Sequence, residues 1–193
     1  MASEVSICNQ AIGWLGGNLI TSLDDQTTEA ILCKANYASL RDAVIEEGKW
    51  TFATRRLKLA LSGEVPEYGY ANRFAIPTEV LSVITVTPNK DQTNGTENFD
   101  WRREEDYIVC DSGVLYAKCI VRITDPSKFG SMFVQALAAR MAADLAAPLT
   151  ESTAKEQKMT AKYENAIDKA LAIDGMQGKS DRIKSNSNIL KRR

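Results

Sequence analysis

The segment WTFATRRLKLA, residues 50–60, marks the point at which the hydrophobic period of this 193-residue chain changes. Before it, apolar residues recur at the three- and four-residue spacing of a helix. From Leu57 through Leu59 to Leu61 they alternate, which predicts an extended strand with Arg56 and Lys58 on its opposite face. The segment therefore predicts a junction between a helical region and a β-rich region.

Two amphipathic helices are predicted before the junction. The first covers about residues 3–15 and ends at the Gly16-Gly17 pair. The second covers about residues 27–47, and Asp24 and Asp25 are its candidate caps.

Helical periodicity returns after Asp125-Pro126. An alanine-rich pattern predicts a third helix that is stopped by Pro148. Thr150 with Glu151 is expected to start a fourth helix, which ends near Gly175.

The middle of the chain is predicted to form strands and turns. Residues 81–86 are rich in β-branched side chains, which favour strands. Residues 107–110 and 114–123 flank Asp111-Ser112-Gly113, a turn signal that predicts an antiparallel hairpin.

These patterns predict an α+β fold, in which a discontinuous four-helix domain is interrupted by a small antiparallel β domain and followed by an extended C-terminal tail. The predicted boundaries are 1–54 and 125–176 for the helical domain, 55–124 for the β insert and 177–193 for the tail. With 44% hydrophobic residues, a chain of this length can bury roughly 70% of its unfolded surface, so it needs no metal or disulfide to fold.

The charge of the chain is unevenly distributed. The whole chain has a formal net charge of −1. Residues 179–193 contain six basic residues and one acid, a net of +5, which leaves 18 basic and 24 acidic residues, a net of −6, in the rest. The body and the tail are therefore expected to meet different partners.

The composition argues against many enzyme classes. The chain has no histidine, which removes the commonest general base and metal ligand. The four cysteines show no C-x-x-C spacing, no secretory signal precedes them, and no apolar run approaches the roughly 20 residues of a membrane span. We expect no catalytic residue, metal, cofactor or membrane partner, and cytoplasmic synthesis with free thiols.

The order of short motifs along the chain resembles the tail tubular protein A family, the head-to-tail adaptors of short-tailed bacteriophages. The resemblance covers most of the chain up to the basic tail. The matching residues are Ile7-Cys8-Asn9-Gln10-Ala11, Leu15-Gly16-Gly17, Ser22-Leu23-Asp24-Asp25, Glu29-Ala30, Tyr37, Leu40-Arg41-Asp42, Trp50, Phe52-Ala53, Arg55-Arg56, Leu59-Ala60, Tyr70, Ile76-Pro77, Leu115-Tyr116, Asp125-Pro126, Phe129 and Leu149-Thr150.

This resemblance implies a structural protein of the virion, made in the host cytoplasm and located in the tail at the portal vertex. Adaptors of this family form a ring, usually twelvefold, between the portal protein and a tail nozzle of the tail tubular protein B type, with tail fibres as further candidate partners. DNA passes through the ring without sequence-specific binding. An acidic body fits a channel that repels phosphate, and a neutral or basic lumen would contradict that expectation.

The basic tail has two interpretations. As a solvated terminus it would be disordered, since it has few large apolar residues. Alternatively, it docks on the portal or on a neighbouring subunit, with Ile189 and Leu190 as buried anchors and Lys191, Arg192 and Arg193 as steering charges.

Four residues at the junction are candidate subunit contacts. Trp50 and Phe52 are either core aromatics or intersubunit anchors. Arg55 and Arg56 pair with acids either across a subunit boundary or within one chain, where such a pair contributes roughly 0 to 1 kcal/mol.

Two alternatives belong to other classes. A tail-associated hydrolase of cell-surface polymers would need paired carboxylates, for which Asp100, Glu104, Glu105 and Asp106, or Asp24 and Asp25, are available. A nucleic-acid-binding module would use the basic tail and show salt-dependent affinity for DNA.

Overall fold

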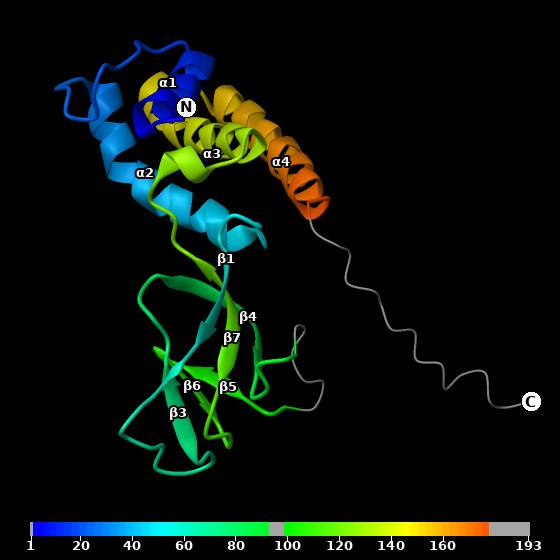
Figure 1. The fold of residues 1–193 in the computed structure, drawn as a ribbon. Coiled ribbons are helices and arrows are strands. Elements are labelled where there is room, and N and C mark those ends of the chain that lie inside the picture. The colour runs from blue at the N-terminus through cyan, green and yellow to red at the C-terminus, as the bar shows by residue number, and fades with distance from the viewer. Residues whose placement is uncertain (1, 93–98, 178–193) are drawn as a thin grey trace, which may run out of the picture.

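A computed structural model describes residues 2–92 and 99–177 of the chain (Figure 1). Within these ranges it has four α-helices and two small antiparallel sheets, which confirms the predicted α+β class. The predicted tail lies outside the described residues, apart from Gln177.

The helices come from both ends of the chain and pack around one central helix. They are α1 (Glu4–Leu15), α2 (Thr28–Glu47), α3 (Ser131–Thr150) and α4 (Thr153–Gly175). The alanine-rich α3 contacts the other three, because its small side chains allow close approach. By length and composition α3 could cross a membrane, yet here half of its apolar window is buried, as in the core helix of a globular fold.

The start of α2 differs from the prediction. Its cap is Thr27, whose hydroxyl accepts a hydrogen bond from the Ala30 amide at 3.3 Å. Asp25 instead accepts bonds from the amides of Thr21 and Ser22, and Asp24 pairs with Lys34. The prediction of Asp24 and Asp25 as caps was wrong, since both lie in the turn that precedes the helix.

The end of α3 also differs, because Pro148 does not stop the helix. A proline this close to the C-terminus removes one backbone bond, and the Thr150 hydroxyl donates a bond to the Ala146 carbonyl at 2.7 Å in the same turn. The helix ends at Thr150, and Glu151, which follows it, has a left-handed backbone with φ of 49°. Ser152, not Thr150, then caps α4.

The strands between the helix pairs form two sheets. The first has the order β1-β7-β4, and the second has the order β2-β3-β6-β5. The strands are β1 (Thr54–Lys58), β2 (Ala60–Leu61), β3 (Asn72–Ala75), β4 (Val80–Thr87), β5 (Arg102–Glu104), β6 (Tyr107–Cys110) and β7 (Tyr116–Val121).

The predicted hairpin around Asp111-Ser112-Gly113 was wrong, because β6 and β7 belong to different sheets. Asp111 accepts a bond from the Ala71 amide at 3.0 Å, beside the start of β3. The buried Leu115 then accepts a bond from the Leu59 amide at 2.9 Å. The chain passes from one sheet to the other through the buried Leu115, which a local turn signal cannot reveal.

A joint connects the helices to the first sheet, at the place where the chain passes between them twice (Figure 1). Phe52 contacts Phe129 and Phe133. The rings of Phe133 and Trp50 meet in an edge-to-face arrangement, with their centroids 4.9 Å apart. The Asp42 carboxylate of α2 accepts bonds from Arg41 and from Arg122, which follows β7, at 2.7 and 2.6 Å. The segment at which the hydrophobic period changes, residues 50–60, therefore lies at the joint between the helices and the first sheet.

Candidate functional site: a basic pocket on the three-stranded sheet

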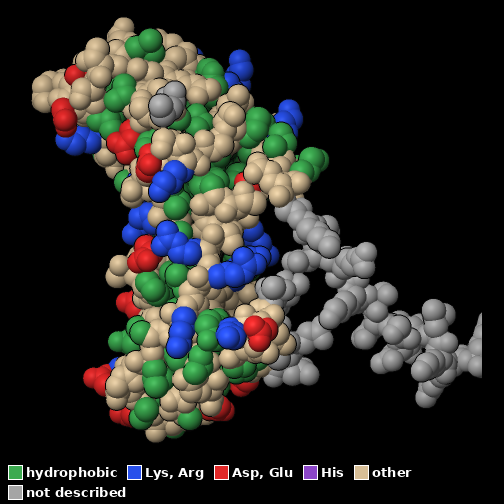
Figure 2. Space-filling view, viewed as in Figure 1, with side chains coloured by type: hydrophobic (Ala, Val, Ile, Leu, Met, Phe, Trp, Pro, Cys, Tyr) green, Lys and Arg blue, Asp and Glu red, His purple; other side chains and the backbone are tan. Residues whose placement is uncertain are grey.

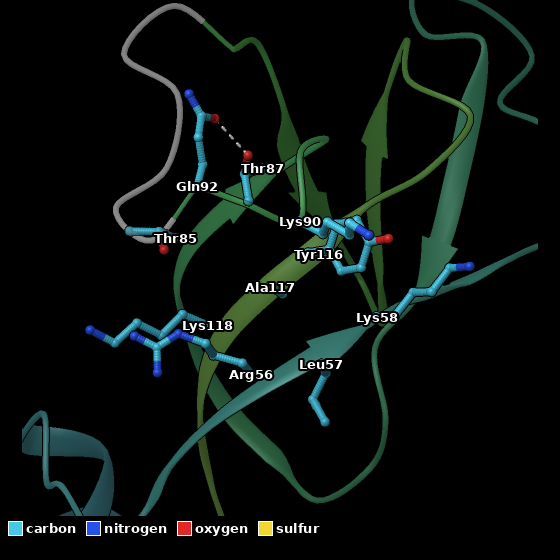
Figure 3. Close-up of a pocket in the computed structure, with 10 residues that line it drawn as sticks. All are labelled: Arg56, Leu57, Lys58, Thr85, Thr87, Lys90, Gln92, Tyr116, Ala117 and Lys118. Atoms are coloured by element: carbon cyan, nitrogen blue, oxygen red, sulfur yellow. Dashed lines mark hydrogen bonds between the residues drawn. The ribbon is translucent and has the colours of Figure 1, made fainter.

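The outer face of the β1-β7-β4 sheet holds a pocket of about 290 Å³, which we call the basic pocket (Figure 3). Four of its lining residues are cations, and among the described residues no acid lines it. The lining consists of Arg56, Lys58, Lys90 and Lys118, the polar residues Thr85, Thr87 and Gln92, and Leu57, Tyr116 and Ala117.

Strand register places these side chains in two rows. In one row, Lys118 of β7 lies opposite Arg56 of β1 and Thr85 of β4. In the next row along the strands, Tyr116 lies opposite Lys58 and Thr87. Side chains two residues apart share a face, so both rows belong to one surface. Figure 3 shows the Arg56 and Lys118 side chains extending in the same direction.

A bulge in β4 brings its threonines onto this face. The register passes from Val83 opposite Cys119 directly to Thr85 opposite Lys118, so Ile84 is the extra residue. A bulge of this kind re-aims the side chains that follow it. Without the bulge, Ile84 and Val86 would lie on this face in place of Thr85 and Thr87.

Thr87 organises the loop that supplies Lys90 and Gln92. Its buried hydroxyl donates to the Gln92 side-chain carbonyl at 2.9 Å and accepts from the Asn89 amide at 3.2 Å. The turn that follows β4 therefore folds back over the end of the sheet, which places Lys90 at the pocket.

The basic pocket brings four cations together with no acid among its described lining residues. Arg56 and Lys118 are direct cross-strand partners, and like charges in that position destabilise a sheet. None of the four cations forms an ion pair within residues 2–92 and 99–177, which is also true there of Arg103 and of every lysine except Lys34. In the view of Figure 2, Lys and Arg side chains gather across the middle of the molecule, and several Asp and Glu side chains lie at its lower end. The basic pocket is therefore positively charged, although residues 1–178 together have a negative net charge.

The predicted junction residues have different surroundings. Trp50 is 1% exposed and donates its indole N–H to the Val44 carbonyl at 2.9 Å, so it is a core residue and not an accessible anchor. Phe52 is partly buried in the aromatic joint. Arg55 pairs within the chain with Glu79 at 3.7 Å, and Arg56 lines the basic pocket. The docking residues Ile189, Leu190, Lys191, Arg192 and Arg193 lie outside the described residues.

The carboxylates available to a hydrolase do not converge. Asp100 accepts a bond from the Tyr70 hydroxyl at 3.1 Å and pairs with Arg102. Glu104, Glu105 and Asp106 are exposed where β5 turns into β6. In the described part of the chain, no group of three or more acids, cysteines or histidines could hold a metal ion.

The four cysteines are free and buried. Burial raises the pKa of the Cys119 thiol to about 11, and the pKa of Cys110 is raised for the same reason. The thiols of Cys8 and Cys33 bond to each other, which raises the pKa of Cys8. The same hydrogen bond lowers the pKa of Cys33. Cys8, Cys110 and Cys119 are therefore protonated at neutral pH, as expected for packing residues.

A scan against protein-family models and a search of curated proteins give no match to this chain.

The sequence patterns did not predict most of the residues that line the basic pocket. The alternation at residues 56–61 placed Arg56 and Lys58 on one face, which was a usable signal. Lys118 and Thr85 join them through pairing between segments about 30 to 60 residues apart, for which the sequence has no local signal.

Proposed function

We propose that this protein is a structural head-to-tail adaptor of a short-tailed bacteriophage. In this role it forms a ring, of twelve subunits in the family it resembles, between the portal and a tail nozzle of the tail tubular protein B type. DNA passes through the centre of the ring. The protein acts in the virion tail at the portal vertex, without turnover of a substrate.

The observation that carries the proposal is that each end of the subunit presents large exposed apolar side chains, although others, such as Ile173 and Met176 at the end of α4, lie elsewhere. Leu19, in the loop before α2, and Ile31, in the first turn of α2, are exposed at the helical end. Val65 and Tyr68 are exposed in the loop between β2 and β3, at the opposite end (Figure 1). Tyr68 is 89% exposed and Leu19 67% exposed, so both are free to contact other proteins. A subunit that links two different rings needs contacts of this kind at both ends.

The residues that carry the resemblance support the same conclusion, because several of them hold the fold together. Asn9 bonds both the amide and the carbonyl of Ile20 at 2.8 Å, which closes the loop after α1. Arg41 and Asp42 form the ionic part of the joint. A shared set of structural residues favours a shared fold.

Native mass spectrometry of the full chain, alone and mixed with the portal ring of the same phage, tests the proposal. We expect either a ring of the free protein or a complex with a fixed number of subunits on each portal ring. A protein that remains monomeric and does not bind the portal ring would overturn the proposal of an adaptor function.

Surface variants then test the two ends separately. Leu19→Ser with Ile31→Ser and Val65→Ser with Tyr68→Ser should each abolish one contact, either to the portal or to the nozzle, and leave the other. Met176→Ser is the matched control, since Met176 is an exposed apolar residue at the end of α4 that belongs to neither group. Loss of both contacts, or of neither, in the paired variants would contradict the assignment of one partner to each end.

A further inference from the structure

We propose that the basic pocket binds the phosphodiester backbone of a nucleic acid strand. The proposal goes beyond the adaptor function and does not depend on it, because it rests on the sheet face alone.

The first support is a local excess of positive charge. Arg56, Lys58, Lys90 and Lys118 give the pocket a formal charge of +4, whereas residues 1–178 together have a net charge of −6. A single carboxylate would neutralise one of the four cations. A nucleic acid strand, with one negative charge on every nucleotide, can neutralise several at once.

The second support is the kind of donor. Three of the four cations are lysines, which act as point charges, and Thr85 of β4 adds a hydroxyl at the same surface. Lysine, arginine and hydroxyl groups are all common partners of phosphate oxygens. The donor set is therefore suited to a phosphate.

The third support is the geometry of the two rows. Rows two residues apart along a strand are separated by about 7 Å. This spacing lets successive phosphates of one strand each meet one row, the first at Arg56 and Lys118 and the next at Lys58. Tyr116 lies in the second row and is half-buried, so its ring is held as an apolar surface for a sugar or base.

The fourth support is the energetic cost of the arrangement. Arg56 and Lys118 repel each other across the ladder, and no carboxylate among the described residues forms an ion pair with either of them. A bound polyanion would offset the repulsion between Arg56 and Lys118.

Fluorescence anisotropy with labelled single-stranded and duplex DNA tests the proposal. Measurements use the full-length chain with the six basic residues of 179–193 changed to glutamine, so that the tail does not contribute. We expect binding whose affinity falls with salt, and Lys58→Gln with Lys118→Gln should lower the slope of log affinity against log salt by about 2, one for each lysine. Comparison of the two DNA forms shows whether Tyr116 favours the single strand.

The control is Lys128→Gln with Lys169→Gln, which removes the same charge from exposed positions outside the pocket. An equal change of slope in both double variants would overturn the proposal. The proposal would also be overturned if the chain does not bind DNA but binds a labelled polyglutamate peptide or inorganic pyrophosphate through Lys58 and Lys118.

Thermal unfolding separates this function from a structural role. Because Lys118 faces Arg56, Lys118→Gln should leave the Tm unchanged or raise it while DNA binding falls, and Lys118→Arg should restore binding. A Tm that falls together with affinity would show that Lys118 supports the fold, and would overturn its role in binding.

Discussion

Gly48 lies where α2 leads into the joint, and it has no room for a side chain. A Cβ atom there would lie 2.5 Å from Leu171 Cδ2 and 2.6 Å from the Trp50 indole nitrogen. We expect Gly48→Ala to lower the free energy of unfolding by about 1–3 kcal/mol, since crowding forces packed groups apart. Urea denaturation measures the change.

Gly13→Ala is the matched control for that substitution. Gly13 lies inside α1, and a Cβ there would meet nothing within 4 Å. Alanine should therefore stabilise the helix by roughly 0.5–1 kcal/mol. If both alanine variants shift stability in the same direction, crowding at Gly48 is not the cause.

Asp25 should make stability depend on pH. Its carboxylate accepts backbone bonds from Ser22 and Thr21, which hold its pKa below the ordinary value of 3.8. Because the folded-state pKa is lowered, this contribution is present above 3.8 and is lost as the pH falls below that value toward the lowered pKa. In a plot of Tm against pH, Asp25→Asn should reduce the fall of the Tm at acid pH. If the variant and the wild type lose Tm in parallel, Asp25 does not cause this pH dependence.

At the scale of elements, the ionic joint between α2 and the end of β7 depends on Asp42. Arg41 is 6% exposed, so removal of its carboxylate partner leaves a buried charge unpaired. We expect Asp42→Asn to cost roughly 3 kcal/mol in the free energy of unfolding, measured in guanidinium.

Arg122→Gln is the milder comparison at the same joint. The Arg122 side chain is partly exposed, so its loss should cost about 1 kcal/mol or less. Equal losses in the two variants would show that burial of Arg41 does not set the cost.

At the scale of the whole molecule, the buried cluster of the described residues runs from Ile7 to Ala170. We expect deletion of 179–193 to leave the Tm unchanged and to weaken attachment to the portal ring, as measured by thermal unfolding and native mass spectrometry. Unchanged attachment would favour a solvated terminus.

The α+β class, the four helices and the extended character of residues 54–61 could be predicted from the sequence, because each rests on local periodicity. Gly16 and Thr27, for example, end or start helices through the conformation of a few neighbouring residues. The division into two sheets and the grouping of Lys118 with Arg56 were decided only by the tertiary structure. Sheet register and the bulge in β4 depend on how strands distant in sequence bury their apolar faces together, so the basic pocket appears only when those strands meet.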